Sequence, residues 1–214
     1  MYNDAYFSKR LSWDARRNGV WKELARFFLP WFPNPANRII EIGAGHCAWI
    51  NAIQAPERYA VDAANIVRTY AGAGVTVIVG DAADLAFAKD ASVDVVLASN
   101  LFEHLNANAL DVALQEIFRA LRCQGRLFIV QPNFRYAWRE YFDDYTHQTI
   151  FTDRGLCGKL ESVGFRVVRC WPRLLPFSFK STALPTPWFL VRAYLYSPWR
   201  PGAKQTAIIA EKIQ

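Results

Sequence analysis

A short stretch with two glycines has the residue types and spacing of a ligand-binding loop. An apolar run of the sequence ends in Glu41, and Gly43 and Gly45 follow at once. Glycines in such a turn let the backbone bend sharply and approach a ligand, because no Cβ stands in the way. Asp62 ends the next apolar run, where a carboxylate can accept hydrogen bonds from both hydroxyls of a ribose. The pattern predicts a nucleotide-type ligand, and by itself it also fits a nicotinamide-binding domain.

Further residues at the ends of apolar runs help to distinguish between ligands of this type. Glu41 stands just before the glycines, where a carboxylate disfavours a pyrophosphate but suits a cationic amino-acid group. Asp81 follows a third apolar run and can accept a hydrogen bond from an adenine amino group. Asn100 follows a fourth run, and a glycine turn at Gly125 precedes a fifth. These features together disfavour the nicotinamide alternative.

With these residues in this order, the segment 38–165 resembles the class I S-adenosylmethionine-dependent methyltransferases of the compact single-domain type. The resemblance implies an enzyme whose cofactor is S-adenosyl-L-methionine. It assigns the glycine loop to the methionine side of the cofactor, and later residues to the ribose, the adenine and the region near the sulfonium. The family usually has a third glycine where Cys47 stands, so we expect the loop geometry to depart there without loss of binding. The cofactor-binding residues implied in this way are Glu41, Gly43, Gly45, Asp62, Ala63, Asp81, Ala82 and Asn100.

A long polar and aromatic segment after the fifth apolar run is the candidate acceptor site. Methyl transfer from a sulfonium depends on positioning, and a hydroxyl acceptor also needs a general base. We predict His147 and Asp144 as catalytic residues; the alternative for His147 is an imidazole that caps the following turn. Glu103 is interpreted as an acid favoured at a helix start. The residues predicted to bind the acceptor are His104, Arg135, Tyr141 and Asp143.

Apolar runs alternate with helical patterns along the chain, which predicts an α/β fold with a parallel sheet. The resemblance makes this a Rossmann-like, seven-stranded, mostly parallel sheet with helices on both faces, an antiparallel last strand and a long insert between strands 6 and 7. Thr152 is a plausible N-cap. The expected strands are 38–42, 58–61, 75–79, 93–98, 126–131, 165–171 and 206–212. The expected helices are 13–29, a helix from the glycine turn through about 53, 108–121, 153–163 and 188–196.

Positive charge is concentrated near the C-terminus. The chain has 25 Lys and Arg against 19 Asp and Glu, and no acidic residue lies between Glu161 and Glu211. This basic stretch is also rich in proline and aromatic residues, so it fits an anionic membrane surface, a lipid phosphate, nucleic acid or a lid packed on the domain. We expect one methyltransferase domain over 1–214, with an N-terminal helical cap over 1–36 and a basic aromatic insert over 172–204.

The leading functional hypothesis is O-methylation of a sugar or a lipid-linked saccharide. The segment 142–147 (FDDYTH) and the basic insert are similar to methyltransferases of bacterial cell-surface polysaccharide and glycolipid pathways. The alternatives are a soluble small-molecule methyltransferase and a non-catalytic module that binds S-adenosylmethionine. A nucleic-acid acceptor is not expected, because no Asn-Pro-Pro-Tyr or Asp-Pro-Pro-Tyr motif follows the fourth apolar run and the basic residues are interleaved with hydrophobic ones.

Composition limits the remaining classes. With 52% hydrophobic residues the chain can form a real core, which excludes a disordered protein. The start of the chain lacks an apolar signal region and no apolar run is long enough to span a bilayer, so we expect a cytoplasmic protein. We also expect peripheral contact with the inner face of the membrane through residues 172–204. Four widely separated cysteines argue against a zinc site and against a disulfide framework, so no metal is expected.

Overall fold

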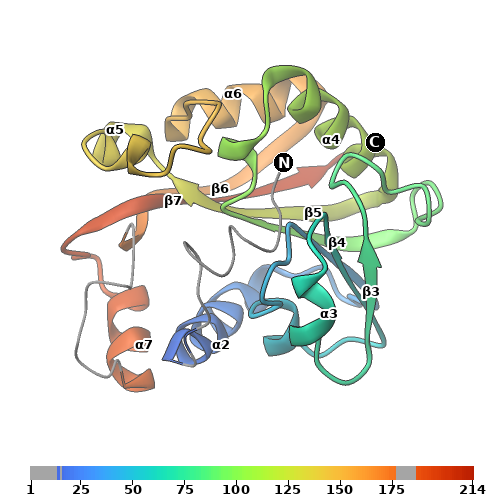
Figure 1. Cartoon of the computed structure of the whole chain (residues 1–214), viewed down its shortest axis with the longest axis horizontal. Helices are drawn as coiled ribbons and strands as arrows, with labels where there is room; N and C mark the ends of the chain where they lie inside the picture. The colour runs from blue at the N-terminus through green and yellow to red at the C-terminus, as the bar shows by residue number, and fades with distance from the viewer. Residues whose placement is uncertain (1–13, 15, 177–186) are drawn as a thin grey trace.

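The fold is described from a computed structural model of the chain, which describes residues 14, 16–176 and 187–214. Within these residues, seven strands form one sheet in the order β3-β2-β1-β4-β5-β7-β6 (Figure 1). Strands β1 to β5 run parallel, and β7 is antiparallel to both β5 and β6. The Rossmann-like sheet with an antiparallel end is therefore confirmed. The strands are β1 (Arg38–Ile42), β2 (Glu57–Asp62), β3 (Val75–Val79), β4 (Val93–Ser99), β5 (Leu121–Pro132), β6 (Phe165–Pro176) and β7 (Ala203–Lys212).

Helices cover both faces of the sheet. Three of them, α4, α5 and α6, lie above the sheet in the view of Figure 1, whereas α2 and α7 lie side by side below it. Thr152 caps α6 as expected, because its Oγ1 accepts a hydrogen bond of 3.1 Å from the Gly155 amide. The α-helices are α2 (Arg16–Phe28), α3 (Ile66–Tyr70), α4 (Ala107–Ala120), α5 (Phe134–Ala137), α6 (Asp153–Val163) and α7 (Trp188–Tyr196). The short 3-10 turns are η1 (Leu29–Trp31), η2 (Ile50–Ala52), η3 (Phe102–His104) and η4 (Tyr141–Asp143).

The core has two layers because successive side chains of a strand point to opposite faces of the sheet. Ile39 of β1 belongs to the cluster that includes Leu24 of α2, and the next residue, Ile40, belongs to the cluster that includes Leu114 of α4. All four side chains are fully or almost fully buried. Each contributes about 1.5 to 3 kcal/mol through burial. Burial on both faces explains why the strands read as uninterrupted apolar runs.

The helix expected between the glycine turn and residue 53 is wrong. Only the short turn η2 forms there, between stretches of irregular turns. Two side chains hold this segment in another shape. Glu41 accepts a hydrogen bond of 2.9 Å from the Ile50 amide, and Asn51 donates one of 2.8 Å to the Tyr70 carbonyl. The segment is therefore tied to the loop and to α3 by side chains and does not form a continuous helix.

The strands that flank the basic insert are longer than expected. The sixth strand was expected over 165–171, and the next residue, Pro172, has no amide hydrogen to pair. In the structure β6 continues to Pro176, and the pairing with β7 shifts register between Trp171 and Leu175. The irregularity lets the strand pass the proline. Residues 172–176 and 203–204 of the predicted insert thus belong to the sheet.

The remainder of the insert contains α7, whose bounds are as expected. Its side chains Val191 and Leu195 are buried in the same cluster as α2, and Arg192 Nε lies 2.8 Å from Glu23 Oε2. Residues 177–186 of the predicted insert lie outside the described residues. Among the residues that are described, no helix combines the length and apolar character needed to cross a bilayer.

The strand order creates a switch point between β1 and β4. The chain moves outward from β1 to β2 and β3, then returns to place β4 on the other side of β1. The loops that follow β1 and β4 therefore run in opposite directions. Open parallel sheets bind ligands in the crevice beyond the carboxyl ends of such strands.

Candidate functional site

The glycine loop lies at this switch point. Gly43 and Gly45 have φ angles of +63° and +48°, a region that glycine enters without steric cost. A Cβ on Gly43 would stand 2.9 Å from Leu101 Cδ1. The loop after β1 therefore packs directly against the side chain of Leu101, two residues beyond the end of β4. Cys47, where the family usually has a third glycine, also has a positive φ of 55°. The cysteine therefore adopts the left-handed conformation that a glycine would adopt there.

Two buried carboxylates hold this loop in place. Asp62 Oδ2 accepts a hydrogen bond of 2.8 Å from the Gly45 amide, and its Oδ1 accepts one of 2.8 Å from the Ala64 amide. Glu41 Oε2 accepts its bond from Ile50. Burial raises the pKa of Glu41 to about 8 and also raises the pKa of Asp62. A pKa of about 8 favours the protonated form of Glu41 at neutral pH, and a neighbouring cation would lower that pKa.

The other residues expected to bind the cofactor lie along the same edge of the sheet. Ala63 is exposed just beyond β2, and Asp81 is exposed just beyond β3, with the buried Ala82 beside it. Asn100 follows β4 with a φ of 48°, and its side-chain oxygen accepts a hydrogen bond of 3.2 Å from Gln205 Nε2. The eight predicted residues thus lie at or just beyond the carboxyl ends of β3, β2, β1 and β4.

Backbone hydrogen bonds place the segment 141–150 directly on the turn η3 that follows β4. The amides of Gln148 and Thr149 donate to the Glu103 carbonyl over 2.8 and 3.1 Å. Gln148 Nε2 donates to the His104 carbonyl over 2.8 Å, and Thr149 Oγ1 donates to the Leu105 carbonyl over 2.5 Å. Residues about 40 positions apart in the sequence therefore form one site.

The side chains brought together are Glu103, His104 and His147, which we call the acceptor cluster. The two imidazole centroids are 4.7 Å apart, and His104 Nε2 lies 3.9 Å from Glu103 Oε1. Glu103 is fully buried and neither of its carboxylate oxygens accepts a hydrogen bond from the described residues. Burial raises the pKa of Glu103 to about 8, lowers that of His104 to about 4, and lowers that of His147. Without a ligand all three groups are therefore neutral near neutral pH.

A short relay leads from Asp144 to the acceptor cluster. Thr146 Oγ1 donates a hydrogen bond of 2.5 Å to Asp144 Oδ1 and lies 3.1 Å from His104 Nδ1. Because the one hydroxyl hydrogen is used, the threonine oxygen accepts from the Nδ1–H of His104. This tautomer leaves Nε2 of His104 unprotonated and facing Glu103. Asp144, predicted to be catalytic together with His147, is thus connected through Thr146 to His104.

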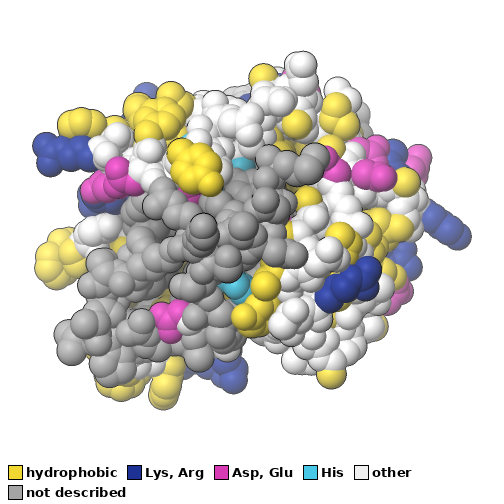
Figure 2. All heavy atoms as spheres, viewed as in Figure 1, with side chains coloured by type: hydrophobic (Ala, Val, Ile, Leu, Met, Phe, Trp, Pro, Cys, Tyr) yellow, Lys and Arg dark blue, Asp and Glu magenta, His cyan; other side chains and the backbone are white. Residues whose placement is uncertain are grey.

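The residues predicted to bind the acceptor have different surroundings. Tyr141 is fully buried, donates a hydrogen bond of 2.7 Å to the Thr149 carbonyl, and packs its ring 4.6 Å from that of His147. It forms the wall behind His147. Arg135 Nε lies 3.7 Å from the buried Asp153, while Asp143 is exposed. On the face of the molecule drawn in Figure 2, histidine side chains reach the surface beside hydrophobic ones.

Sequence reasoning did not assign Glu103 to the site. The signal was present, because an acid and a histidine lie in the turn that follows a strand buried along most of its length. Only the contact with His147, which lies far away in the sequence, shows that these side chains face one another. The exposed rings of Phe142 and Tyr145 lie on the segment 141–150, which also contains His147. The exposed ring of Trp138 lies just before that segment.

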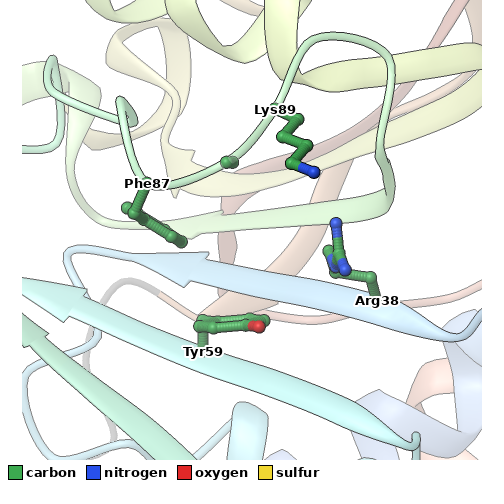
Figure 3. Close-up of a pocket in the computed structure, with 5 residues that line it drawn as sticks. Arg38, Tyr59, Phe87 and Lys89 are labelled. Atoms are coloured by element: carbon green, nitrogen blue, oxygen red, sulfur yellow. The ribbon is translucent and has the colours of Figure 1, made fainter.

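A separate pocket lies away from this edge. Figure 3 shows Arg38 and Tyr59 on β1 and β2, opposite Phe87 and Lys89 of the loop between β3 and β4. Its volume is about 160 Å³. Arg38 is the first residue of β1, and its Nε is held 2.8 Å from Glu57 Oε2. The pocket thus lies toward the amino end of β1, and the predicted site lies at the carboxyl end.

Comparisons with known proteins identify the family to which the chain belongs. A family described as methyltransferase domain matches residues 13–169. No curated protein matches the chain at a significant level.

The chain is also similar to solved structures of S-adenosylmethionine-dependent methyltransferases. One from Archaeoglobus fulgidus is 22% identical with a TM-score of 0.69, over 97% of this chain and 98% of that one. Another from Mesorhizobium loti is 14% identical with a TM-score of 0.65, over 92% of this chain and 100% of that one. At these identities the likeness shows a shared fold.

Proposed function

The chain belongs to the methyltransferase domain family and is an S-adenosylmethionine-dependent enzyme, and from this premise we propose that it methylates a hydroxyl of a sugar or a lipid-linked saccharide. When bound, the cofactor supplies a methyl group carried on a sulfonium. The observation that carries the proposal is the acceptor cluster, because it lies at the carboxyl end of β4, on the strand next to the glycine loop. The cluster can act on an acceptor hydroxyl at that edge.

The cofactor fits the residues of the glycine loop. The turn at Gly43 requires glycine, because its φ is +63° and a Cβ would stand 2.9 Å from Leu101 Cδ1. We assign Glu41 to the cationic amino group of the methionine part, because its buried carboxylate gains a counter-charge there. Asp62 keeps lone pairs free for the ribose hydroxyls while it accepts from two amides. Asp81 and Ala82 are assigned to the adenine, and Asn100 to the region of the sulfonium.

A saccharide acceptor is supported by the chemistry at the rim of the site. The exposed rings of Phe142 and Tyr145 offer flat apolar surfaces for the C–H faces of a sugar. Asp143, between them and exposed, offers a carboxylate to sugar hydroxyls. His147 lies on the same segment, with a buried Nδ1 that has no hydrogen-bond partner among the described residues. These groups support an acceptor rich in hydroxyls.

The exposed apolar face of α7 supports a lipid-linked form of that acceptor. Trp188, Phe189 and Leu190 are all more than half exposed at the start of this helix. Indole and phenyl rings of this kind favour the headgroup region of a membrane. The proposal therefore includes peripheral contact at the inner face of the cytoplasmic membrane, tested by co-sedimentation with anionic vesicles at low and high salt.

The test is a transfer assay with radiolabelled S-adenosylmethionine against sugar nucleotides, free saccharides and polyprenyl-linked saccharides. We expect methyl ether formation on a saccharide hydroxyl, and His147→Ala should lower kcat by about 10²- to 10⁴-fold with the cofactor Kd unchanged. His46→Ala is the contrasting variant, because His46 lies in the glycine loop and should affect cofactor binding. Methylation of small aromatic hydroxyls alone would favour the soluble small-molecule enzyme, and cofactor binding without any transfer would favour the non-catalytic module.

A further inference from the structure

The acceptor cluster has the donor set of a metal site. Its three side chains each offer one ligand atom, and these atoms all lie within 4.8 Å of one another. We propose that Glu103, His104 and His147 bind one divalent transition-metal cation of the zinc type. The inference rests on the proposed function only for the role of the cation, since binding itself does not require methyl transfer.

The Glu103 carboxylate provides the first observation that supports a metal site. It is fully buried, and both of its oxygens lack a hydrogen-bond partner among the described residues. An isolated buried carboxylate is costly, and buried charges in proteins are normally paired or bound to metal. A divalent cation between Glu103 and the imidazoles supplies the missing partner and stabilises the ionised carboxylate.

The orientation of the His104 ring provides the second observation that supports a metal site. Its Nδ1 is held by Thr146, which is in turn held by Asp144, so Nε2 presents a lone pair toward Glu103. A hydrogen bond from the second ring nitrogen, connected to a carboxylate, is the usual arrangement around a metal-bound histidine. Nε2 and Oε1 are 3.9 Å apart, too far for a hydrogen bond between them. Two ligands of a tetrahedral zinc ion lie roughly 3.3 Å apart, so a small side-chain rotation closes the site.

His147 provides the third ligand. Its ring is positioned between Tyr141, at 4.6 Å, and His104, at 4.7 Å. Its Nδ1 is buried and has no hydrogen-bond partner among the described residues. The segment that carries it is bound to η3 through Gln148 and Thr149. The third ligand is therefore held in place before any ion binds.

Two imidazoles and one carboxylate favour zinc-like transition metals over magnesium, which prefers oxygen ligands. Three protein ligands leave a fourth position open, as in catalytic zinc sites. An acceptor hydroxyl bound there has a lowered pKa: the O–H bond breaks, the proton passes to solvent, and the oxygen keeps the electron pair. The cluster would then activate the acceptor through a cation, with His147 as a ligand and not a free base.

The sequence did not predict this site. The absence of a metal was expected from the spacing of the cysteines, and this donor set contains no cysteine. His104 and His147 come from separate segments, so no local ligand motif connects them.

The test uses the full chain after removal of metals with EDTA. Calorimetric titration with zinc chloride should show one site per chain with a Kd at or below about 1 µM. Glu103→Gln and His147→Ala should each weaken zinc binding by at least about 100-fold. The matched controls Glu161→Gln and His46→Gln should leave the zinc Kd unchanged. Binding that Glu103→Gln and His147→Ala do not weaken would overturn the proposal, as would the absence of a micromolar site.

Two further measurements identify the zinc ligands directly and separate the metal proposal from the proposed function. X-ray absorption on the zinc-loaded wild-type chain should show two imidazole ligands, so a cluster variant that fails to fold does not prevent a decision. A spectrum without imidazole ligands overturns the site. Titration with S-adenosylmethionine in the same samples separates the two proposals. A chain that transfers methyl groups to saccharides but binds no zinc overturns this inference alone, and one that binds zinc at the cluster but transfers no methyl group overturns the proposed function alone.

Discussion

The two sides of the site differ in the hydrogen bonds that their buried carboxylates accept. On the cofactor side, Asp62 accepts hydrogen bonds from Gly45 and Ala64, and Glu41 accepts one from Ile50. On the acceptor side, Glu103 is just as deeply buried but accepts none from the described residues. A buried polar group with partners fixes a geometry, whereas the burial of one without partners is not compensated. The chain itself therefore fixes the carboxylates of the proposed cofactor side, and on the proposed acceptor side it leaves the Glu103 carboxylate without a partner among the described residues.

The largest expected effect comes from filling the space at the glycine loop. Gly43→Ala places a Cβ 2.9 Å from Leu101 Cδ1 at a φ of +63°, so the loop must shift. The affinity for S-adenosylmethionine should fall about 100-fold, which is about 2.7 kcal/mol. Calorimetry measures it. The matched control is Gly158→Ala in α6, where a Cβ meets nothing within 4 Å. The control should keep its affinity and gain up to about 1 kcal/mol in unfolding free energy; equal cofactor binding by both variants would refute the loop assignment.

The next effect separates the acceptor side from the cofactor side. Thr146→Val keeps the side-chain shape but removes the hydroxyl that connects Asp144 to His104. Loss of such an outer partner should weaken zinc binding about 10- to 100-fold. The Kd for S-adenosylmethionine should not change, because Thr146 does not belong to the glycine loop. A variant that loses cofactor affinity instead would show that the two sides are not independent.

The pH dependence of cofactor binding tests Glu41. Burial raises its pKa to about 8, with Asp62 adding to the rise, so at lower pH the free chain carries the proton. Pairing with the cationic amino group requires the carboxylate, so binding releases this proton. Affinity should therefore increase by about tenfold per pH unit from about pH 6 to pH 7. Calorimetry in buffers with different ionisation enthalpies would detect the released proton. Glu41→Gln should bind more weakly and without this pH dependence; a wild-type affinity that does not change over this range would contradict the assignment.

The smallest effect concerns the contact between α7 and α2. Arg192 pairs with Glu23 over 2.8 Å, but its side chain is 45% exposed and Glu23 also pairs with Arg26. Arg192→Ala should therefore reduce the unfolding free energy by only about 0.5 kcal/mol. Chemical denaturation measures this, with the exposed Arg154→Ala as the control. A loss of several kcal/mol would mean that docking of α7 depends on this pair more than its exposure indicates.

The comparison between the two sides also explains what could be predicted from the sequence. The glycine loop and its acids are contiguous or follow successive apolar runs, so each residue can be assigned to the carboxyl end of one strand, and the carboxyl ends of these parallel strands share one edge of the sheet. The strand cores were predicted for the same reason, since strands buried on both faces read as apolar runs. The acceptor cluster depends on hydrogen bonds between η3 and the segment 141–150, which no local pattern contains.

Two elements show where local patterns fail. The stretch after the glycine turn was expected to be helical, but a short helix is marginal by itself, and Glu41 and Asn51 tie this stretch to the loop and to α3. Pro172 is a strand breaker by its missing amide, but a register shift against β7 lets β6 continue. Both outcomes depend on tertiary partners that are distant in the sequence.

One measurement tests the division of the site most directly: calorimetric titration of S-adenosylmethionine into the wild-type chain and into Glu103→Gln, with NAD as the control ligand. We expect the same micromolar Kd for both proteins and no heat of binding with NAD. Binding of NAD alone, no binding of S-adenosylmethionine, or loss of cofactor affinity in Glu103→Gln would contradict this expectation.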